Sequence, residues 1–296
     1  MNDQAFALRQ LMCDIAPKSD GAAGARVAAV TSGKGGVGKT SLAVNLALAL
    51  GRRGLRVVIL DADFGLANVN VLLGVTPAFD LSQVVSRRID LREALCDGPC
   101  GVRFLSGGSG MRELTHLSPP RLGALMSNLR QLDDLADVVL IDTGAGVGEQ
   151  VLRVVNAAQE VILVTTPEPT AIMDAYALVK GLAGEGGAPR VRLVVNRAGS
   201  PEEAESTFKT LSAVVRLYLK TDIENMGSLP SDEAVSRAVR LQQPFLISFP
   251  RSAAARSVED LAQRFLDGEP PRKNGLRAFF KRMDWDKSPK DNTEIQ

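Results

Sequence analysis

Short runs of aliphatic residues alternate along the chain with longer segments in which apolar and polar positions follow a helical period. The apolar runs predict strands at residues 26–32, 55–63, 102–106, 136–142, 160–166 and 191–196, with a weaker one near residues 224–229. Most of these strands are apolar at consecutive positions, so both of their faces must be covered. This pattern is typical of a sheet that lies between two layers of helices.

Helical patterns fill the intervals between these strands. They cover residues 40–54, 120–132, 149–156, 170–183, 202–217, 232–241 and 253–266. Strands that alternate with helices predict the α/β class, with a doubly wound, mainly parallel sheet and helices on both faces.

The two ends of the chain do not follow this alternation of strands and helices. We expect an N-terminal helix within residues 1–16, a flexible linker of small residues at 17–25, a domain at 26–268 and a basic tail at 269–296. In the tail, Leu276, Phe279, Phe280 and Met283 fall on one helical face. Basic residues surround that face, as in helices that lie on anionic lipid. The alternative is a terminal helix that docks on its own domain.

Composition narrows the classes of function. The chain has 296 residues, of which 45% are hydrophobic and only 4% aromatic, so aliphatic side chains must fill the core. A net charge of +1 excludes a globally basic nucleic-acid binder but leaves room for a local basic patch. Three cysteines without a secretory context predict reduced thiols. No apolar run reaches the roughly 20 residues of a membrane-spanning helix.

The motif that carries chemistry is "GKGGVGKTS" at residues 33–41, which lies between a predicted strand and a predicted helix. It fits the phosphate-loop pattern, in which glycines let backbone N–H groups converge on phosphate oxygens at a helix N-terminus. We expect Lys39 to bind the β- and γ-phosphates and the Thr40 hydroxyl to ligate Mg²⁺. The residues expected to surround the nucleotide phosphates are Gly33, Lys34, Gly35, Gly36, Val37, Gly38, Lys39, Thr40 and Ser41.

Carboxylates at the ends of predicted strands complete this site. Asp142 closes the run "ADVVLID", in the position of an acid that binds Mg²⁺ directly or through water. Asp61 and Asp63 follow the strand after the phosphate loop, and their spacing puts them on one face if the strand continues. We expect Asp61 to support the metal shell and Asp63 to orient the attacking water. A guanine-reading N-K-x-D motif is missing from "VVNRAGS", which favours adenine and therefore ATP.

The second lysine of the phosphate loop, Lys34, indicates a family. "KGGVGKT" resembles the deviant Walker A motif of MinD/ParA-type ATPases, which are P-loop NTPases of the SIMIBI class. The resemblance extends over about residues 26–267 and implies a homodimer that forms with ATP, in which Lys34 touches phosphates bound by the other subunit. It makes "LDADFGLANVNVLLG" a first switch and "IDTGAGVGE" a second one, where Gly144 replaces the more frequent proline or alanine. It also implies that Asn196, Pro230 and Asp232 surround the adenine.

The N-terminal stretch "DQAFALR" resembles the activator helix of the FlhG type (FleN/YlxH) within that family. The resemblance implies regulation of flagellar number and placement, and cycling between cytosol and membrane. It also implies stimulation of the SRP-type GTPase FlhF, restraint of a flagellar transcriptional activator and contact with flagellar C-ring components. The residues expected to contact the GTPase are Asp3, Gln4, Ala5, Leu8 and Arg9.

Three other functions compete with this one. A partition or positioning ATPase acting on DNA or another cargo would use surface arginines, for which Arg237, Arg240, Arg251 and Arg256 are candidates. An iron–sulfur carrier would need paired cysteines at a dimer interface, and Cys96 and Cys100 lie outside the expected switch region. A pure binding module would use ATP only to set its shape.

Overall fold

A mainly parallel sheet forms the centre of the protein. The computed structural model describes residues 24–63, 68–86, 88–107, 128–183, 189–268 and 275–283. The eight strands of the sheet in this part of the chain are ordered β3-β4-β2-β5-β1-β6-β7-β8, and all neighbours are parallel except β3 and β4. The strands are β1 (Arg26–Ser32), β2 (Val57–Ala62), β3 (Cys96–Asp97), β4 (Arg103–Leu105), β5 (Val138–Ala145), β6 (Glu160–Thr165), β7 (Arg190–Ala198) and β8 (Glu224–Pro230). The expected doubly wound α/β fold is confirmed.

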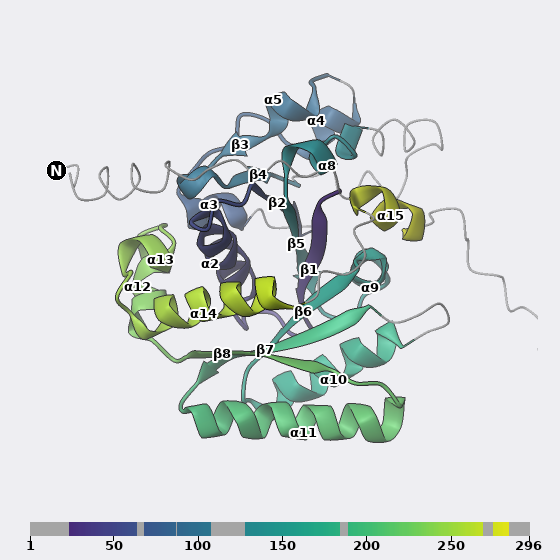
Figure 1. Cartoon of the computed structure of the whole chain (residues 1–296), viewed down its shortest axis with the longest axis vertical. Coiled ribbons are helices and arrows are strands. Elements are labelled where there is room, and N and C mark those ends of the chain that lie inside the picture. Colours follow the sequence, from purple (N-terminus) through teal and green to yellow (C-terminus); the bar gives the residue numbers. More distant parts are fainter. Residues whose placement is uncertain are drawn as a thin grey trace, which may run out of the picture.

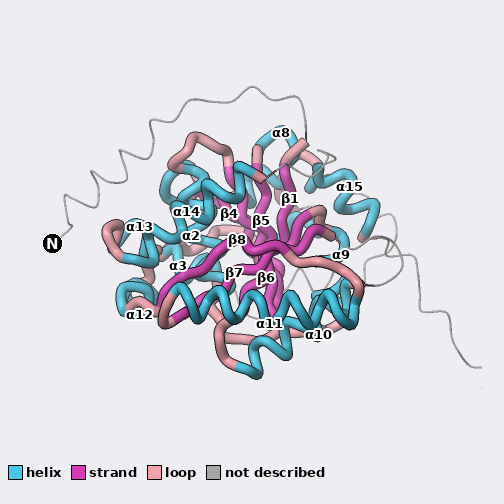
Figure 2. Tube along the Cα trace, turned by 60° about the horizontal axis from the view of Figure 1, so that its bottom comes forward, coloured by secondary structure: helices cyan, strands magenta, loops and turns pink. Residues whose placement is uncertain are grey.

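Helices cover both faces of the sheet (Figure 1). One layer contains α2 (Lys39–Gly51), α3 (Val69–Leu73), α12 (Glu233–Arg240), α13 (Phe245–Ser248) and α14 (Ala253–Asp267). The other contains α9 (Glu149–Ala157), α10 (Pro169–Leu182), α11 (Pro201–Leu219) and α15 (Gly275–Arg282), and Figure 2 shows α10 and α11 side by side along the sheet. The shorter elements are α4 (Leu81–Val85), α5 (Leu91–Ala94), η1 (Pro99–Gly101) and α8 (Leu132–Leu135).

The alternation of side chains along β1 explains why the sheet needs two layers. Val27 and Ala29 point into the core under α9, α10 and α15, whereas Ala28 and Val30 point into the core under α2 and α14. All four side chains are fully buried. Because β1 is central and leads directly into the phosphate loop, both cores hold that loop in place.

The sequence missed several small elements. The strand β3 has two residues and runs antiparallel to β4, while α3, α4, α5 and α13 have four or five residues each. Segments this short carry too few periodic positions to stand out from loops. Local capping marks two of them: Asp80 forms a capping box with Gln83 on α4, and the Asp90 side chain accepts a hydrogen bond from the backbone of α5.

The apolar face of the C-terminal helix, expected either on lipid or on its own domain, is buried in this structure. Leu276, Phe279, Phe280 and Met283 are 0–8% exposed and belong to the core formed with α9, β1 and α8. The alternative, docking on the chain's own domain, holds in this structure. Burying side chains of this size contributes about 1.5–3 kcal/mol each, enough to hold an eight-residue helix that is unstable alone. No helix among the described residues has the length and apolarity to cross a membrane.

One carboxylate joins this helix to the start of the domain. Asp133 Oδ1 accepts hydrogen bonds from the backbone N–H of Leu276 at 2.8 Å and of Ala25 at 3.1 Å. Gly275 has a φ of +54°, and a Cβ atom at this residue would lie 2.3 Å from the same oxygen. Asp133 therefore fixes the first turn of α15 against the segment that enters β1.

We predict that Asp133→Ala destabilises the docked position of α15, because two partly buried N–H groups lose their acceptor, at a cost of about 1 kcal/mol. Hydrogen exchange of the amides in residues 276–283 should accelerate. The Asp133→Asn variant keeps an acceptor oxygen and should lose less protection, and Asp134→Ala, at the exposed neighbouring position, should lose none. Equal protection in Asp133→Ala and the parent would contradict this role.

Candidate functional site

The phosphate loop begins where β1 ends and closes where α2 begins. Gly36 and Gly38 have φ angles of +78° and +91°, which non-glycine residues rarely adopt. A Cβ atom at Gly35 or Gly36 would meet no atom within 4 Å, so the loop leaves open space on that side. No side chain caps the first turn of α2, which leaves its N–H groups for an anion. The geometry fits phosphate groups at the position the sequence predicts.

The two lysines of the loop have different environments. Lys39 is 7% exposed, and its Nζ atom lies 2.8 Å from Asp142 Oδ1 and 3.4 Å from Thr40 Oγ1. Lys34 is 39% exposed and reaches outward to Glu168 and Thr170 at the start of α10. Lys39 therefore lies inside the site, as expected, and Lys34 lies at its surface.

The strand register places two acids directly beside each other. Asp61 on β2 is the register partner of Asp142 on β5, and both are at most 1% exposed. Burial and the neighbouring Asp142 charge together raise the pKa of the Asp61 carboxyl to about 7. Burial also raises the pKa of the Asp142 carboxyl, against the opposing effect of the Lys39 ammonium.

Asp63 belongs to the expected first switch and lies close to the expected second one. Its backbone N–H donates to Asp61 Oδ1 at 3.2 Å, and Asn68 Nδ2 donates to Asp63 Oδ2 at 3.4 Å. A Cβ atom at Gly144 would lie 3.7 Å from Asp63 Oδ1, an ordinary contact distance. The structure therefore brings Asp63 to the second switch, and Gly144 leaves room for the alanine that the family pattern favours.

The donor set fits a magnesium ion that shares its ligands with a nucleotide. Asp142 Oδ2 is buried and has no hydrogen-bond partner among the described residues. The Thr40 hydroxyl lies beside the same carboxylate. Within the described residues, no three His, Cys, Asp or Glu side chains form a group that could hold a metal alone. Mg²⁺ usually takes one or two protein ligands and completes its shell with phosphate and water, and Asp142 and Thr40 match that need.

The residues expected near adenine already hold structural contacts. Asn196 Nδ2 donates to Val37 O at 2.6 Å, which ties the end of β7 to the phosphate loop. Asp232 caps α12 through the N–H of Ala234 at 2.8 Å and accepts the N–H of Ala254 at 3.0 Å. These residues lie at the carboxyl ends of β7 and β8, the correct edge of the sheet, with Pro230 closing β8. Their contact with a base stays a prediction, and sequence reasoning missed the capping role of Asp232.

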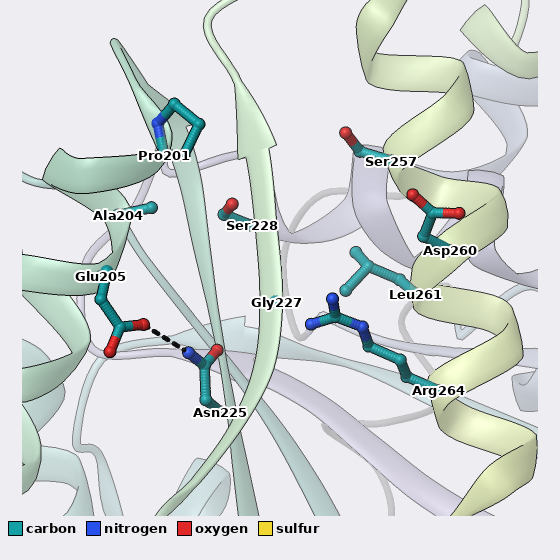
Figure 3. Close-up of a pocket in the computed structure, with 10 residues that line it drawn as sticks. All are labelled: Pro201, Ala204, Glu205, Asn225, Gly227, Ser228, Ser257, Asp260, Leu261 and Arg264. Carbon is teal, nitrogen blue, oxygen red and sulfur yellow. Dashed lines mark hydrogen bonds between the residues drawn. The ribbon is translucent and has the colours of Figure 1, made fainter.

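A polar pocket of about 270 Å³ lies elsewhere, against the edge strand β8 between α11 and α14 (Figure 3). Asn225 Nδ2 donates to Glu205 Oε2 at 3.2 Å on one side of it. On the other side, Arg264 Nη1 donates to Met226 O at 3.2 Å, which occupies a carbonyl of the edge strand. None of the predicted phosphate, metal or catalytic residues lines this pocket, so it is separate from the candidate site.

The remaining sequence predictions have mixed outcomes. The expected contacts of the N-terminal helix, Asp3, Gln4, Ala5, Leu8 and Arg9, lie outside the described residues. Cys96 is free and Cys100 is buried, and the reduced state of the cysteines stays a prediction.

Comparison with known proteins places this site in a family. The ParA family model, described as "NUBPL iron-transfer P-loop NTPase", matches residues 24–266. Antiactivator FleN of Pseudomonas aeruginosa is 46% identical over 239 residues, covering 81% of this chain and 85% of FleN. Flagellum site-determining protein YlxH of Helicobacter pylori is 32% identical over 293 residues, covering 96% and 98% of the two chains.

Solved structures agree with these sequence matches. The septum site-determining protein MinD of Pyrococcus horikoshii OT3, solved as a complex with Mg-ADP, has a TM-score of 0.65 and 25% identity. The match covers 82% of this chain and 96% of that protein. A structural relative therefore carries Mg-ADP, the class of ligand that the phosphate loop and its acids fit here.

We predict that the Asp61 carboxyl makes stability depend on pH in metal-free and nucleotide-free protein. Its pKa is higher in the folded than in the unfolded chain, so the stabilising protonated form is lost as pH rises from about 4 to about 7. The loss amounts to roughly 1.4 kcal/mol per pH unit across that window. Asp61→Asn should remove this part of the slope when urea unfolding is compared at pH 5, 6, 7 and 8. Parallel pH profiles for parent and variant would exclude a raised Asp61 pKa.

Proposed function

The chain belongs to the ParA family of P-loop NTPases, and from this premise we propose that it is an ATP-hydrolysing switch that dimerises with ATP and regulates flagellar number and placement. The observation that carries the proposal is the pair of lysines in one phosphate loop, with Lys39 buried on Asp142 and Lys34 directed outward. A loop that serves only its own nucleotide needs one lysine. The outward lysine is explained if it reaches phosphates that are bound by a second subunit.

The relatives support the flagellar part of this proposal. FleN is named an antiactivator and YlxH a flagellum site-determining protein. The YlxH match extends over nearly the whole of both chains. We therefore place this protein in the same regulatory class, with restraint of a flagellar transcriptional activator and contact with C-ring components as parts of the proposal.

Each residue of the site has a proposed role in hydrolysis. Lys39 would bind the β- and γ-phosphates in place of Asp142, while the loop amides and the first turn of α2 would hold the remaining oxygens. Asp142 and Thr40 would hold Mg²⁺, with Asp61 beside them in the metal shell. The ion, when bound, neutralises charge that develops on the phosphate oxygens. Asp63 orients the attacking water, and Lys34 of each protomer stabilises charge on the phosphates bound by the other.

We also propose that α15 attaches the protein to a membrane during the ATPase cycle. In this structure the apolar face of α15 is buried on α9, which begins directly after the second switch. We propose that the protein is cytoplasmic with α15 docked and reaches an anionic membrane surface with Leu276, Phe279, Phe280 and Met283 once α15 is released. Two such helices in a dimer bind more tightly than one through effective concentration.

A second candidate function is partition or positioning of DNA or another cargo. Arg237, Arg240, Arg251 and Arg256 are exposed, and none of them forms an ion pair with a described residue. Arg237 instead stacks over Phe249 at 4.9 Å. These arginines suit contact with phosphate backbones, and the experiment on the N-terminal segment below discriminates between the two functions.

We predict that Lys34→Ala retains most nucleotide binding but loses ATP-dependent dimerisation and hydrolysis, because Lys39 and the loop amides still hold the nucleotide. Sedimentation with Mg-ATP should give dimers for the parent and monomers for the variant. Asp63→Ala is the matched comparison, since it should dimerise with ATP but fail to hydrolyse it. A Lys34→Ala variant that stays dimeric and active would remove the cross-subunit role.

We predict that a peptide of residues 1–20 stimulates GTP hydrolysis by the cognate FlhF-type GTPase. The polar groups of Gln4 and Arg9 would act at the partner's nucleotide, so a Gln4→Ala peptide should lose the stimulation. If neither peptide stimulates GTP hydrolysis, the ATPase proposal stands but the flagellar role loses its support. DNA partition is then the leading alternative.

Attachment to lipid should depend on the nucleotide. With Mg-ATP the full chain should pellet with anionic liposomes more strongly than with Mg-ADP, and Phe279→Glu should abolish the difference. Equal pelleting of the ATP and ADP forms would show that nucleotide does not control the tail.

A further inference from the structure

The strand β8 ends the sheet in the described part of the chain, and a pocket of about 270 Å³ lies along its outer side. Figure 3 shows this pocket between α11 and α14, with the edge strand running through its centre. Three of its lining residues, Asn225, Gly227 and Ser228, belong to β8, while Glu205 comes from α11 and Asp260 from α14. The two helices therefore leave part of the sheet edge uncovered.

The backbone on the outer side of β8 has few partners. The pairing of β8 with β7 is parallel and uses only the backbone groups that point toward β7. Among the described residues, Arg264 is the only one that bonds to the outer side of the β8 backbone, through Nη1 and Met226 O at 3.2 Å. An edge strand with free N–H and C=O groups can pair with another extended chain. The pocket thus offers a place for one more strand.

A bulge in β8 explains how α14 can lie so close to this edge. The pairing with β7 skips Met226, which is an extra residue in β8. Gly227 follows with a φ of +136°, and a Cβ atom there would lie 2.8 Å from Leu261 Cδ2 and 3.1 Å from Arg264 Nη1. Glycine therefore lets α14 approach the strand, and Arg264 holds the carbonyl of the bulged residue. The bulge itself is protected, whereas the backbone beyond it borders the pocket.

Each helical wall of the pocket carries one carboxylate. Glu205 on α11 is 47% exposed and accepts a hydrogen bond from Asn225 Nδ2 at 3.2 Å. Its ion-pair partner Lys209 lies at 3.5 Å and is 72% exposed, so solvent screens that pair. Asp260 on α14 is exposed and forms no ion pair with a described residue. With Arg264 as the only cation in the lining, the pocket carries a net negative charge.

We propose that this pocket binds an extended segment of a partner protein, which carries two consecutive basic residues and adds to β8 as a further strand. Successive side chains of a strand point to opposite faces, so one basic side chain faces Glu205 and the next faces Asp260. The aliphatic stems of lysine or arginine pack on Pro201, Ala204 and Leu261, which line the pocket beside the carboxylates. No residue of the phosphate loop lines this pocket, so the inference does not depend on the proposed ATPase cycle.

The first arm of the test measures peptide binding to the full-length protein without nucleotide. The probe is a pool of fluorescein-labelled, end-capped hexapeptides with Arg-Lys or Lys-Arg at the two central positions and Val, Thr or Ile elsewhere. A matched acidic pool carries Asp-Glu or Glu-Asp at the same positions. The parent should bind the basic pool and not the acidic one, as measured by fluorescence polarisation.

Single-charge variants test the two walls. Glu205→Gln and Asp260→Asn should each weaken binding of the basic pool by about two- to fivefold, as expected for the loss of an exposed ion pair. Glu93→Gln is the matched control, because Glu93 is an exposed acid on α5, the helix that directly precedes the opposite edge strand β3. It should bind the basic pool like the parent.

The second arm tests whether the ligand forms a strand. The tightest-binding sequence of the basic pool is N-methylated at one backbone nitrogen at a time. Methylation at every second residue should abolish binding and methylation between them should not, because only alternate N–H groups of an added strand point toward β8. Hydrogen exchange of amides in residues 225–229 should also slow when the unmethylated peptide is added.

Each other outcome would overturn the proposal. No binding of the basic pool at millimolar peptide, or equal binding of both pools, would exclude recognition of a basic segment. Equal effects of methylation at every position would exclude strand addition. Nucleotide-free dimers that protect residues 225–229 without peptide would show that a second copy of the chain occupies the edge instead. ATP hydrolysis and dimerisation with ATP test the proposed function separately.

Discussion

The buried ion pair between Lys39 and Asp142 is the interaction on which the site depends. It joins the first residue of α2 to β5 across 2.8 Å, with the lysine 7% exposed and the aspartate fully buried. A buried charge without a partner is strongly unfavourable, so neither residue can lose the other unless a new partner replaces it. A nucleotide and its metal would supply both replacements, phosphate for Lys39 and a cation for Asp142. The pair therefore holds the loop in shape and would make its rearrangement depend on ligand.

Two helices extend the site in opposite directions. Through Gly33 and Lys34 the phosphate loop rests on α10, the helix whose first turn holds the outward lysine. Through the second switch β5 continues into α9, and α9 supports the docked helix α15. A structural change at the phosphate loop could therefore affect the proposed dimer contact through α10. It could also affect the C-terminal helix through α9. Both sets of contacts are present in this structure.

The sequence predicted the features that follow from strong local patterns. Buried strands appeared as aliphatic runs, and the phosphate loop appeared as a motif between a strand and a helix, so the fold, Lys39 and Asp142 were all predictable. The register that sets Asp61 beside Asp142 depends on the pairing of distant strands, and no local pattern encodes it. The same holds for the buried cluster of Glu160 with Arg26 and Arg192, for the bond between Asp232 and Ala254 and for the Glu168 contact. The sequence left the docking of the tail open for a related reason, because an amphipathic face has the same pattern whether it packs on lipid or on its own domain.

The central claim is that Lys34 exchanges a partner in its own protomer for phosphates in another. A crystal structure with Mg²⁺ and a non-hydrolysable ATP analogue tests this most directly. The account predicts two protomers with their phosphate loops face to face, Lys34 Nζ within hydrogen-bond distance of the phosphates in the opposite protomer, and no contact to Glu168. Nucleotide bound in each loop with Lys34 still on Glu168 and Thr170 of its own chain would contradict it.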